Sequence, residues 1–164
     1  MLLRPTQPLD DVDDGVRDLV RDLADTMYTA PGIGLAANQI GDTRRVCVVD
    51  VTTGEEPDSL HVFINPTIVS EDGSDTAEEG CLSFPDVTLE IERAFRTTVR
   101  ALDLDGSPFE LEAEGMLARA ILHECEHLDG QVFLRNVSSL KREHVKRQIR
   151  KRIKAGDWVA AEAQ

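Results

Sequence analysis

The chain has 164 residues, of which 30% are charged and 41% hydrophobic, and its formal net charge is −13. This length suits one compact domain covering residues 1–164, and the composition excludes disordered and membrane-spanning classes of protein. Because no apolar run could cross a bilayer and no charged-then-apolar leader opens the chain, a soluble, cytoplasmic protein is expected.

The first expected element is a helix from Asp10 to Ala30, in which apolar residues recur at spacings of three and four. Pro31-Gly32 ends this helix, and the Gly- and Ala-rich residues 33–39 do not resemble an ordinary strand. Alternation and β-branched residues then predict a series of strands, the last two joined by an Asp-Gly turn. These strands are expected at residues 45–51, 60–64, 67–70, 88–94, 97–103 and 108–113.

Two more helices are expected at Gly115–Leu128 and at residues 139–155, each followed by a glycine of the kind that ends helices. The order of elements predicts an α+β fold, with mainly antiparallel strands wrapped around the second of the three helices. No repeat or linker divides the chain, which supports a single domain.

The second helix carries the segment His123-Glu124-Cys125-Glu126-His127. His123 and His127 are four residues apart, so both rings leave the same face of a helix and could close on one divalent cation beside Glu124. The alternative is that the two histidines are exposed on a surface helix and bind no metal. The mostly apolar residues 117–122 favour the metal site, because two unpaired imidazoles in a core would be costly.

Cys81 is the candidate third ligand, in a segment before Pro85 that is expected to be irregular; the alternative is a small buried hydrophobic residue. The odd number of cysteines has no disulfide spacing, so all are interpreted as reduced thiols, with Cys47 buried and inert. Gly32-x-Gly34 permits close backbone approach but does not identify a function. Gln39 could hold its side-chain amide against a crowded site.

In chain order, Gly32–Gln39, Glu79–Ser83 and His123–His127 resemble the three motifs of the peptide deformylase family. These motifs are Gly-x-Gly-Leu-Ala-Ala-x-Gln, Glu-Gly-Cys-Leu-Ser and His-Glu-x-x-His. The short connection between the second and third motifs, and the C-terminal helix, resemble the bacterial type 1 branch. The resemblance covers nearly the whole chain and implies an enzyme that removes the formyl group from the N-terminal formyl-methionine of nascent proteins.

The resemblance implies that Cys81, His123 and His127 bind one divalent metal ion, with water in the fourth position. Fe²⁺ is the expected ion in the cell, with Zn²⁺, Ni²⁺ or Co²⁺ as substitutes, since these ligand types suit several metals. A metal-bound hydroxide would attack the formyl carbon, with Glu124 as general base and then acid.

Gln39 and the backbone N–H of Leu82 would bind the developing oxyanion. Backbone groups after the first helix would pair with an extended formyl-methionyl peptide. The expected substrate-binding residues are Ile33, Gly34, Leu35, Glu79 and Gly80. Three residues of the second helix, Leu117, Ala120 and Ile121, are expected to line the methionine pocket.

The chain departs from the family pattern at four places. Glu126 stands where Asp is usual, and Leu122 stands where Gln is usual. Residues 87–89 offer no basic side chain to a peptide, which suggests modest substrate affinity. An N-terminal extended segment common in relatives is absent, so an exposed sheet edge is expected.

The C-terminal helix is strongly basic, with eight Lys or Arg and one acid in residues 141–154. It is interpreted either as a solvated surface helix pinned by a narrow apolar stripe, or as a docking helix for ribosomal RNA. A monomer is expected, with no DNA or membrane partner.

Two alternative functions stay open at this point. One is a zincin-like endopeptidase, against which Cys81 argues because such proteases rarely use a thiolate ligand. The other is a catalytically idle, ribosome-associated relative, against which the intact Glu124, Gln39 and Cys81 argue.

Overall fold

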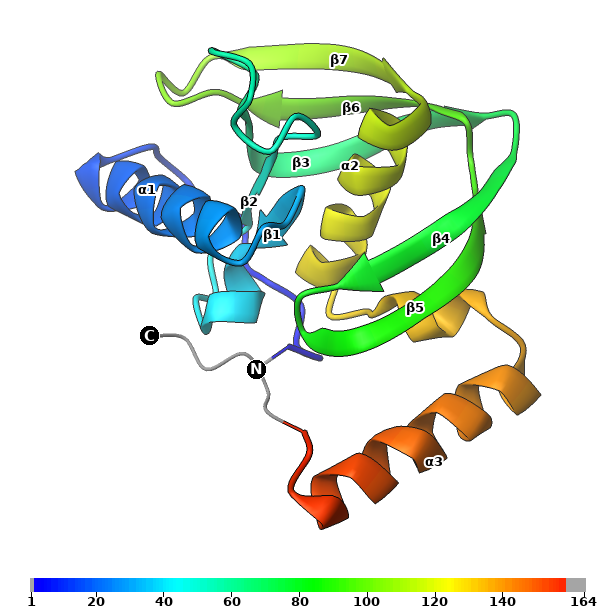
Figure 1. Ribbon diagram of the computed structural model, residues 1–164. Helices are drawn as coiled ribbons and strands as arrows, with labels where there is room; N and C mark the ends of the chain where they lie inside the picture. Colours follow the sequence, from blue (N-terminus) through cyan, green and yellow to red (C-terminus); the bar gives the residue numbers. More distant parts are fainter. Residues whose placement is uncertain (1, 159–164) are drawn as a thin grey trace.

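The computed structural model describes residues 2–158, and residue 1 and residues 159–164 of the expected domain lie outside the described part. Within that part the chain forms helices packed on antiparallel sheets, which confirms the α+β fold (Figure 1). The elements are α1 (Asp14–Thr29), β1 (Gly34–Ala36), η1 (Ala37–Ile40), β2 (Val46–Val49), β3 (His61–Asp72), β4 (Asp75–Cys81), β5 (Phe84–Arg93), β6 (Arg96–Leu102), β7 (Pro108–Glu114), α2 (Gly115–Leu128), η2 (Phe133–Asn136) and α3 (Ser139–Ala155). None of the helices in residues 2–158 is long and apolar enough to cross a membrane.

Five strands form one sheet in the order β1-β2-β3-β6-β7, and β4 and β5 form a separate hairpin. Helix α2 lies between this sheet and the hairpin, while α1 covers the other face of the sheet (Figure 1). Strand β2 explains the arrangement, because successive side chains in a strand point to opposite faces. Val46 and Val48 pack with α1, whereas Cys47 and Val49 pack with α2, so this strand is buried on both faces.

The segment after α1 differs from the prediction. Residues 34–36 form the edge strand β1, paired with β2 through Leu35 and Val48, and a 3₁₀ helix follows directly. Burial of Leu35 and Ala36 against the sheet outweighs the weak strand preference of this Gly- and Ala-rich sequence.

Two strands were also predicted incompletely. The expected strands at 60–64 and 67–70 are one long strand, β3, whose register with β6 shifts after Ile64. Asn65 sits at this irregularity with a φ of +52°, and its side-chain amide exchanges two hydrogen bonds with the backbone of Leu9. Strand β4 was not predicted from the sequence, because it is polar and mostly exposed and therefore carries little apolar periodicity. The irregular stretch expected around Cys81 is the end of β4 and the turn before β5, where the pairing register shifts.

Candidate active site

The three expected ligands meet at one point of the structure. Cys81 ends β4, and His123 and His127 project from α2, with their ligand atoms all within 4.8 Å of one another. The Cys81 Sγ atom is 3.2 Å from His127 Nε2, which is 3.1 Å from His123 Nε2. One thiolate and two imidazole nitrogens at these separations are the donor set of a four-coordinate catalytic metal with an open position.

Local structure explains why these atoms converge. The spacing of four residues brings the two rings onto the same face of α2, with ring centroids 4.8 Å apart. On the hairpin, the β4–β5 register shifts between Gly80 and Cys81, where a tight turn begins. Such a shift re-aims a side chain, and here it accompanies a Cys81 thiol directed at α2.

The protonation states of the two histidines differ before any metal binds. Burial lowers the pKa of His127 to about 3, so its ring is neutral and ready to act as a ligand. Burial also lowers the pKa of His123, but contacts with Cys81 and Glu79 outweigh it and raise the pKa to about 10. A metal ion must therefore displace a proton from this region, as is usual when imidazole and thiol ligands bind cations.

Glu124 is buried beside the cluster and lines the same hollow. Burial raises its pKa to about 7, against the charges of His123 and Arg93, which lower it. Its Oε2 atom has no hydrogen-bond partner among the described residues. A buried carboxylate oxygen that is free to exchange a proton is what a general base requires.

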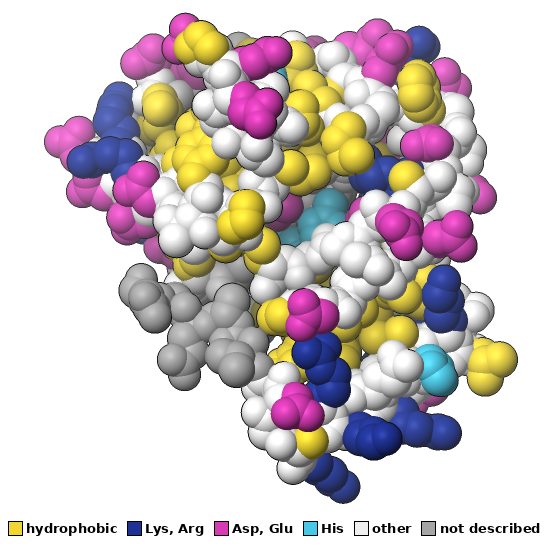
Figure 2. Space-filling view, in the orientation of Figure 1, with side chains coloured by type: hydrophobic (Ala, Val, Ile, Leu, Met, Phe, Trp, Pro, Cys, Tyr) yellow, Lys and Arg dark blue, Asp and Glu magenta, His cyan; other side chains and the backbone are white. Residues whose placement is uncertain are grey.

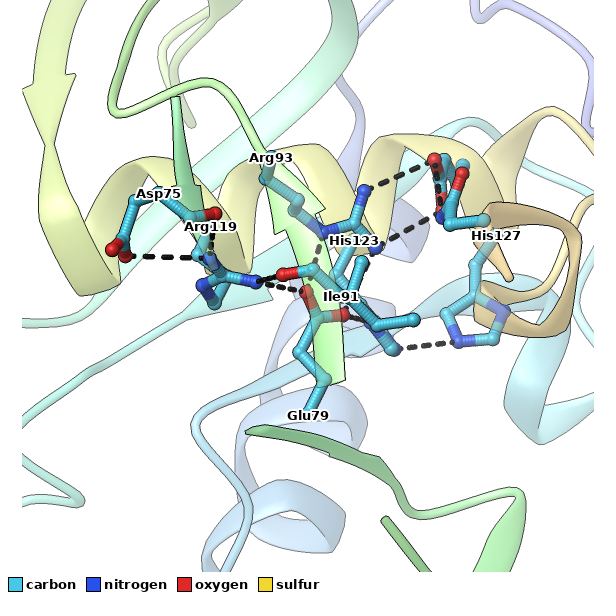
Figure 3. A network of polar contacts seen from close by, with 9 residues as sticks. Asp75, Glu79, Ile91, Arg93, Arg119, His123 and His127 are labelled. Atoms are coloured by element: carbon cyan, nitrogen blue, oxygen red, sulfur yellow. Dashed lines mark hydrogen bonds and ion pairs between the residues drawn. The ribbon is translucent and has the colours of Figure 1, made fainter. Parts of the chain in front are cut away.

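The carboxylate of Glu79 orients His123 (Figure 3). Its Oε1 atom lies 2.8 Å from His123 Nδ1, which leaves Nε2 directed at the ligand cluster. Burial alone would raise the pKa of Glu79, but bonds from His123 and Arg93 lower it to about 2. Arg119 donates to the remaining side of the carboxylate, with Nη1 2.8 Å from Oε2.

Glu126 forms the outer end of this network. Arg93 donates from Nη1 and Nη2 to its two oxygens at 3.0 and 3.1 Å, and Asn136 also donates to both oxygens. The longer side chain at this position therefore reaches a paired contact with Arg93, which in turn grips Glu79. Leu122 is buried and lines a small polar cavity next to the same pair.

A hollow of about 580 Å³ opens from the ligand cluster, and histidine surface is visible inside it (Figure 2). It lies between the residues preceding β1, the β4–β5 hairpin and α2. The helix contributes Met116, Arg119 and Ala120 one and two turns before the metal ligands. Of the three predicted pocket residues only Ala120 lines this hollow, because Leu117 and Ile121 are on the opposite face of α2 and pack against the sheet.

The free edge of β1 borders the hollow. The carbonyl of Ile33 accepts a bond from the Asp50 N–H of the neighbouring chain segment, at 2.9 Å. Since peptide groups alternate in direction along a strand, those of Gly34 point to the open edge. Leu35 again faces β2, so among the predicted residues Ile33, Gly34 and Leu35 it is Gly34 whose backbone is free for an extended ligand.

Gln39 and Leu82 flank the cluster from two sides. The Gln39 amide accepts a bond from the Ala36 N–H and directs Nε2 toward Ser83 Oγ, at 3.1 Å, and Cys81 Sγ, at 3.8 Å. Leu82 follows Cys81 directly at the hairpin turn and lines the hollow. Both predicted oxyanion donors therefore lie beside the candidate metal position.

Arg93, Arg119 and Met116 were not identified from the sequence. A signal existed for Arg119, because an arginine between two alanines on an apolar helix face must find buried partners. For Arg93 and Met116 no local pattern distinguishes the residue from an ordinary strand or surface position.

A soft thiolate and two imidazoles around one position, with an unpaired carboxylate and an open strand edge beside them, define a metallohydrolase that acts on an extended chain. The model of the polypeptide deformylase family matches residues 1–143. The chain therefore belongs to the peptide deformylase family, enzymes that remove the N-formyl group from nascent proteins.

Relatives and solved structures agree with this assignment. The peptide deformylase of Acidobacterium capsulatum is 46% identical over 96% of this chain and 93% of its own length. Peptide deformylase 1 of Burkholderia multivorans is 49% identical over 92% of this chain and 82% of its own. The crystal structure of a peptide deformylase from Legionella pneumophila superposes with a TM-score of 0.85 at 40% identity, covering 94% and 91% of the two chains. These matches favour deformylation over the endopeptidase alternative.

We predict that Gly34→Ala displaces Glu124 without abolishing metal binding. An added Cβ at Gly34 would lie 2.5 Å from Glu124 Oε1, so the carboxylate must move. Displacement of a reacting group by about 1 Å costs on the order of 100-fold in rate, which is the expected loss of formate release. Gly15→Ala, on α1, is the control; equal activity of the two variants would contradict the close contact.

Proposed function

We propose that this protein hydrolyses the N-formyl group of formyl-methionyl peptides with a divalent metal ion held by Cys81, His123 and His127. The observation that carries the proposal is the unpartnered Oε2 atom of Glu124 next to this ligand cluster. A buried carboxylate oxygen without a hydrogen-bond partner costs free energy, so its presence calls for a functional reason. The function proposed here is proton transfer. We place the reaction in the cytoplasm, where nascent chains emerge.

The donor set fits Fe²⁺ in the cell and Zn²⁺, Ni²⁺ or Co²⁺ as substitutes, because one thiolate and two imidazoles suit each of these ions. When bound, such an ion acts as a Lewis acid toward the formyl oxygen and makes a coordinated water more acidic. Glu79 keeps His123 oriented for this role.

Glu124 moves the proton. Its carboxylate accepts a proton from the attacking water as the new C–O bond forms at the formyl carbon. The same oxygen then delivers that proton to the amine nitrogen as the C–N bond breaks, so the products are formate and a free amino terminus. The pocket position of Glu124 next to Gly34 supports this path, since the open edge of β1 would hold the substrate backbone there.

Gln39 Nε2 and the backbone N–H of Leu82 are proposed as donors to the oxyanion. Their position beside Cys81 supports this role, and one such donor contributes roughly 3 kcal/mol to lowering a barrier of this kind. Gly34 is proposed to pair with the peptide backbone, with Glu79 and Gly80 forming the facing side of the hollow.

The direct test is formate release from formyl-Met-Ala-Ser by the anaerobically prepared, metal-loaded protein. We predict that Glu124→Gln lowers kcat by at least about 100-fold while metal content is unchanged, since the lost step is proton transfer. Glu90→Gln, an exposed carboxylate on β5 that does not line the hollow, is the matched control. Full activity of Glu124→Gln would rule out this mechanism.

We also propose that α3 docks on ribosomal RNA. Val145 and Ile149 fix the helix against the hydrophobic cluster under the hairpin, and Arg142 and Arg152 bind backbone carbonyls. Figure 2 shows Lys and Arg side chains on the surface around α3. The exposed cationic side chains of this helix are Lys141, Lys146, Arg147, Arg150, Lys151 and Lys154. A dense row of exposed cations on an acidic protein is suited to a polyanion.

Ribosome co-sedimentation tests this docking. Replacing Arg147, Lys151 and Lys154 together by Ala should weaken binding and lower the slope of log affinity against log salt by about 2–3. Deformylation of a free peptide should persist, because these side chains do not line the hollow. Arg100→Ala, an exposed cation on β6, is the control. Co-sedimentation that is insensitive to the triple substitution and to salt would eliminate the proposal.

A further inference from the structure

Arg119 occupies an unusual position, because one side chain belongs to both the substrate hollow and the metal-ligand network. It lies on α2 one turn before His123 and is 3% exposed. It lines the hollow together with Met116 and Ala120. Its guanidinium also donates to Glu79, the carboxylate that orients His123.

The guanidinium of Arg119 is held by acceptors from both strands of the hairpin. Nη1 donates to Glu79 Oε2 and to the Ile91 carbonyl, each at 2.8 Å. Nη2 donates to the Asp75 carbonyl at 2.7 Å and to its carboxylate at 3.3 Å (Figure 3). A planar fork with four such contacts cannot shift to admit a larger ligand without breaking several charged hydrogen bonds.

Charges along this network alternate from one end to the other. Asp75, Arg119, Glu79 and Arg93 follow one another through hydrogen bonds (Figure 3). Arg93 continues the chain to Glu126, so Glu79 is at its centre. Each buried arginine is thus compensated by Glu79 and by one outer carboxylate. Two arginines hold Glu79 from different sides, but they face different surroundings.

Arg93 provides the comparison. It grips Glu79 through Nε and Nη2 at 2.6 and 2.9 Å, yet it lines the small cavity near Glu126 and Asn136 rather than the substrate hollow. Met116 provides the opposite comparison, since it lines the substrate hollow and is half exposed, outside the hydrogen-bonded chain. Of these three residues, only Arg119 both lines the substrate hollow and donates to Glu79.

We propose that Arg119 is a positioning residue that ties the size of the substrate's side-chain pocket to the orientation of the metal ligand His123. The inference rests on the proposed function. The stem of Arg119 limits the hollow beyond Ala120, and its guanidinium keeps Glu79 fixed on His123 Nδ1. The pocket wall is therefore as rigid as the metal site, and a side chain that displaces Arg119 also disturbs His123.

Three substitutions separate the two roles: Arg119→Ala, Arg93→Ala and Met116→Ala. Two quantities are measured for each variant and the wild type. The first is zinc affinity, by competition with a chelator. The second is selectivity, as the ratio of kcat/KM for formyl-Met-Ala-Ser to that for formyl-Phe-Ala-Ser.

Arg119→Ala should lower zinc affinity about 10–100-fold, the usual effect of removing a partner of a metal ligand. It should also lower the preference for methionine by at least about 10-fold, because the pocket lengthens. Arg93→Ala should change zinc affinity alone, and Met116→Ala should change selectivity alone. Arg119→Lys, which keeps the charge but lacks the fork, should show both defects in weaker form and replaces Arg119→Ala if that variant does not fold.

An Arg119 variant that matches either control, changing one quantity only, overturns the inference. Failure of the proposed function gives a different result, namely a zinc-binding wild type that releases no formate from formyl-Met-Ala-Ser. In that case the preference is measured as calorimetric binding of the two peptides to the zinc-free protein. Unchanged preference in the Arg119 variants would then contradict the inference, whereas a reduced preference together with weaker zinc binding would support it.

Discussion

The carboxylate of Glu79 is the contact on which the site depends. It brings together β4, which carries Cys81, β5, which carries Arg93, and α2, which carries Arg119 and His123. A buried carboxylate is costly in isolation, but here every side of it is occupied by a charged or imidazole donor. Removing one partner of such a network leaves uncompensated charge, so the hairpin and the helix are held in one relative position.

The sheet supplies the second constraint, because it fixes α2 and the substrate edge from the other side. Alternation in β2 buries one set of side chains under α2 and the other under α1, so neither helix can slide without exposing apolar surface. β1 pairs with this strand and thereby places Gly34 against Glu124. The base, the ligands and the open strand edge are thus positioned by separate parts of the fold that meet at α2.

The sequence predicted the convergence of the three candidate ligands and the course of the helices well, because these depend on short-range spacing. Helix α1 begins at Asp14 rather than at the expected Asp10, because the side chain of Asp13 caps it. His123 and His127 share a helix face through a spacing of four, and the family motifs supplied Cys81. The sequence predicted β4 and the Glu79 network poorly. Strand β4 is polar, and its place is decided by distant arginines on β5 and α2, which no local pattern reveals. Two of the three residues predicted to line the pocket, Leu117 and Ile121, face the sheet instead, and the residues just before them in the chain, Met116 and Ala120, line the hollow. Their apolar character gave no means of telling the two faces of α2 apart.

The most direct test of this account is the zinc affinity of Glu79→Gln, measured by chelator competition in the absence of peptide. The amide keeps the size of the side chain but loses the charge that binds both arginines and His123. The account predicts an affinity about 10–100-fold below that of the wild type, in a protein that retains its fold. An affinity equal to that of the wild type would contradict the central role of Glu79.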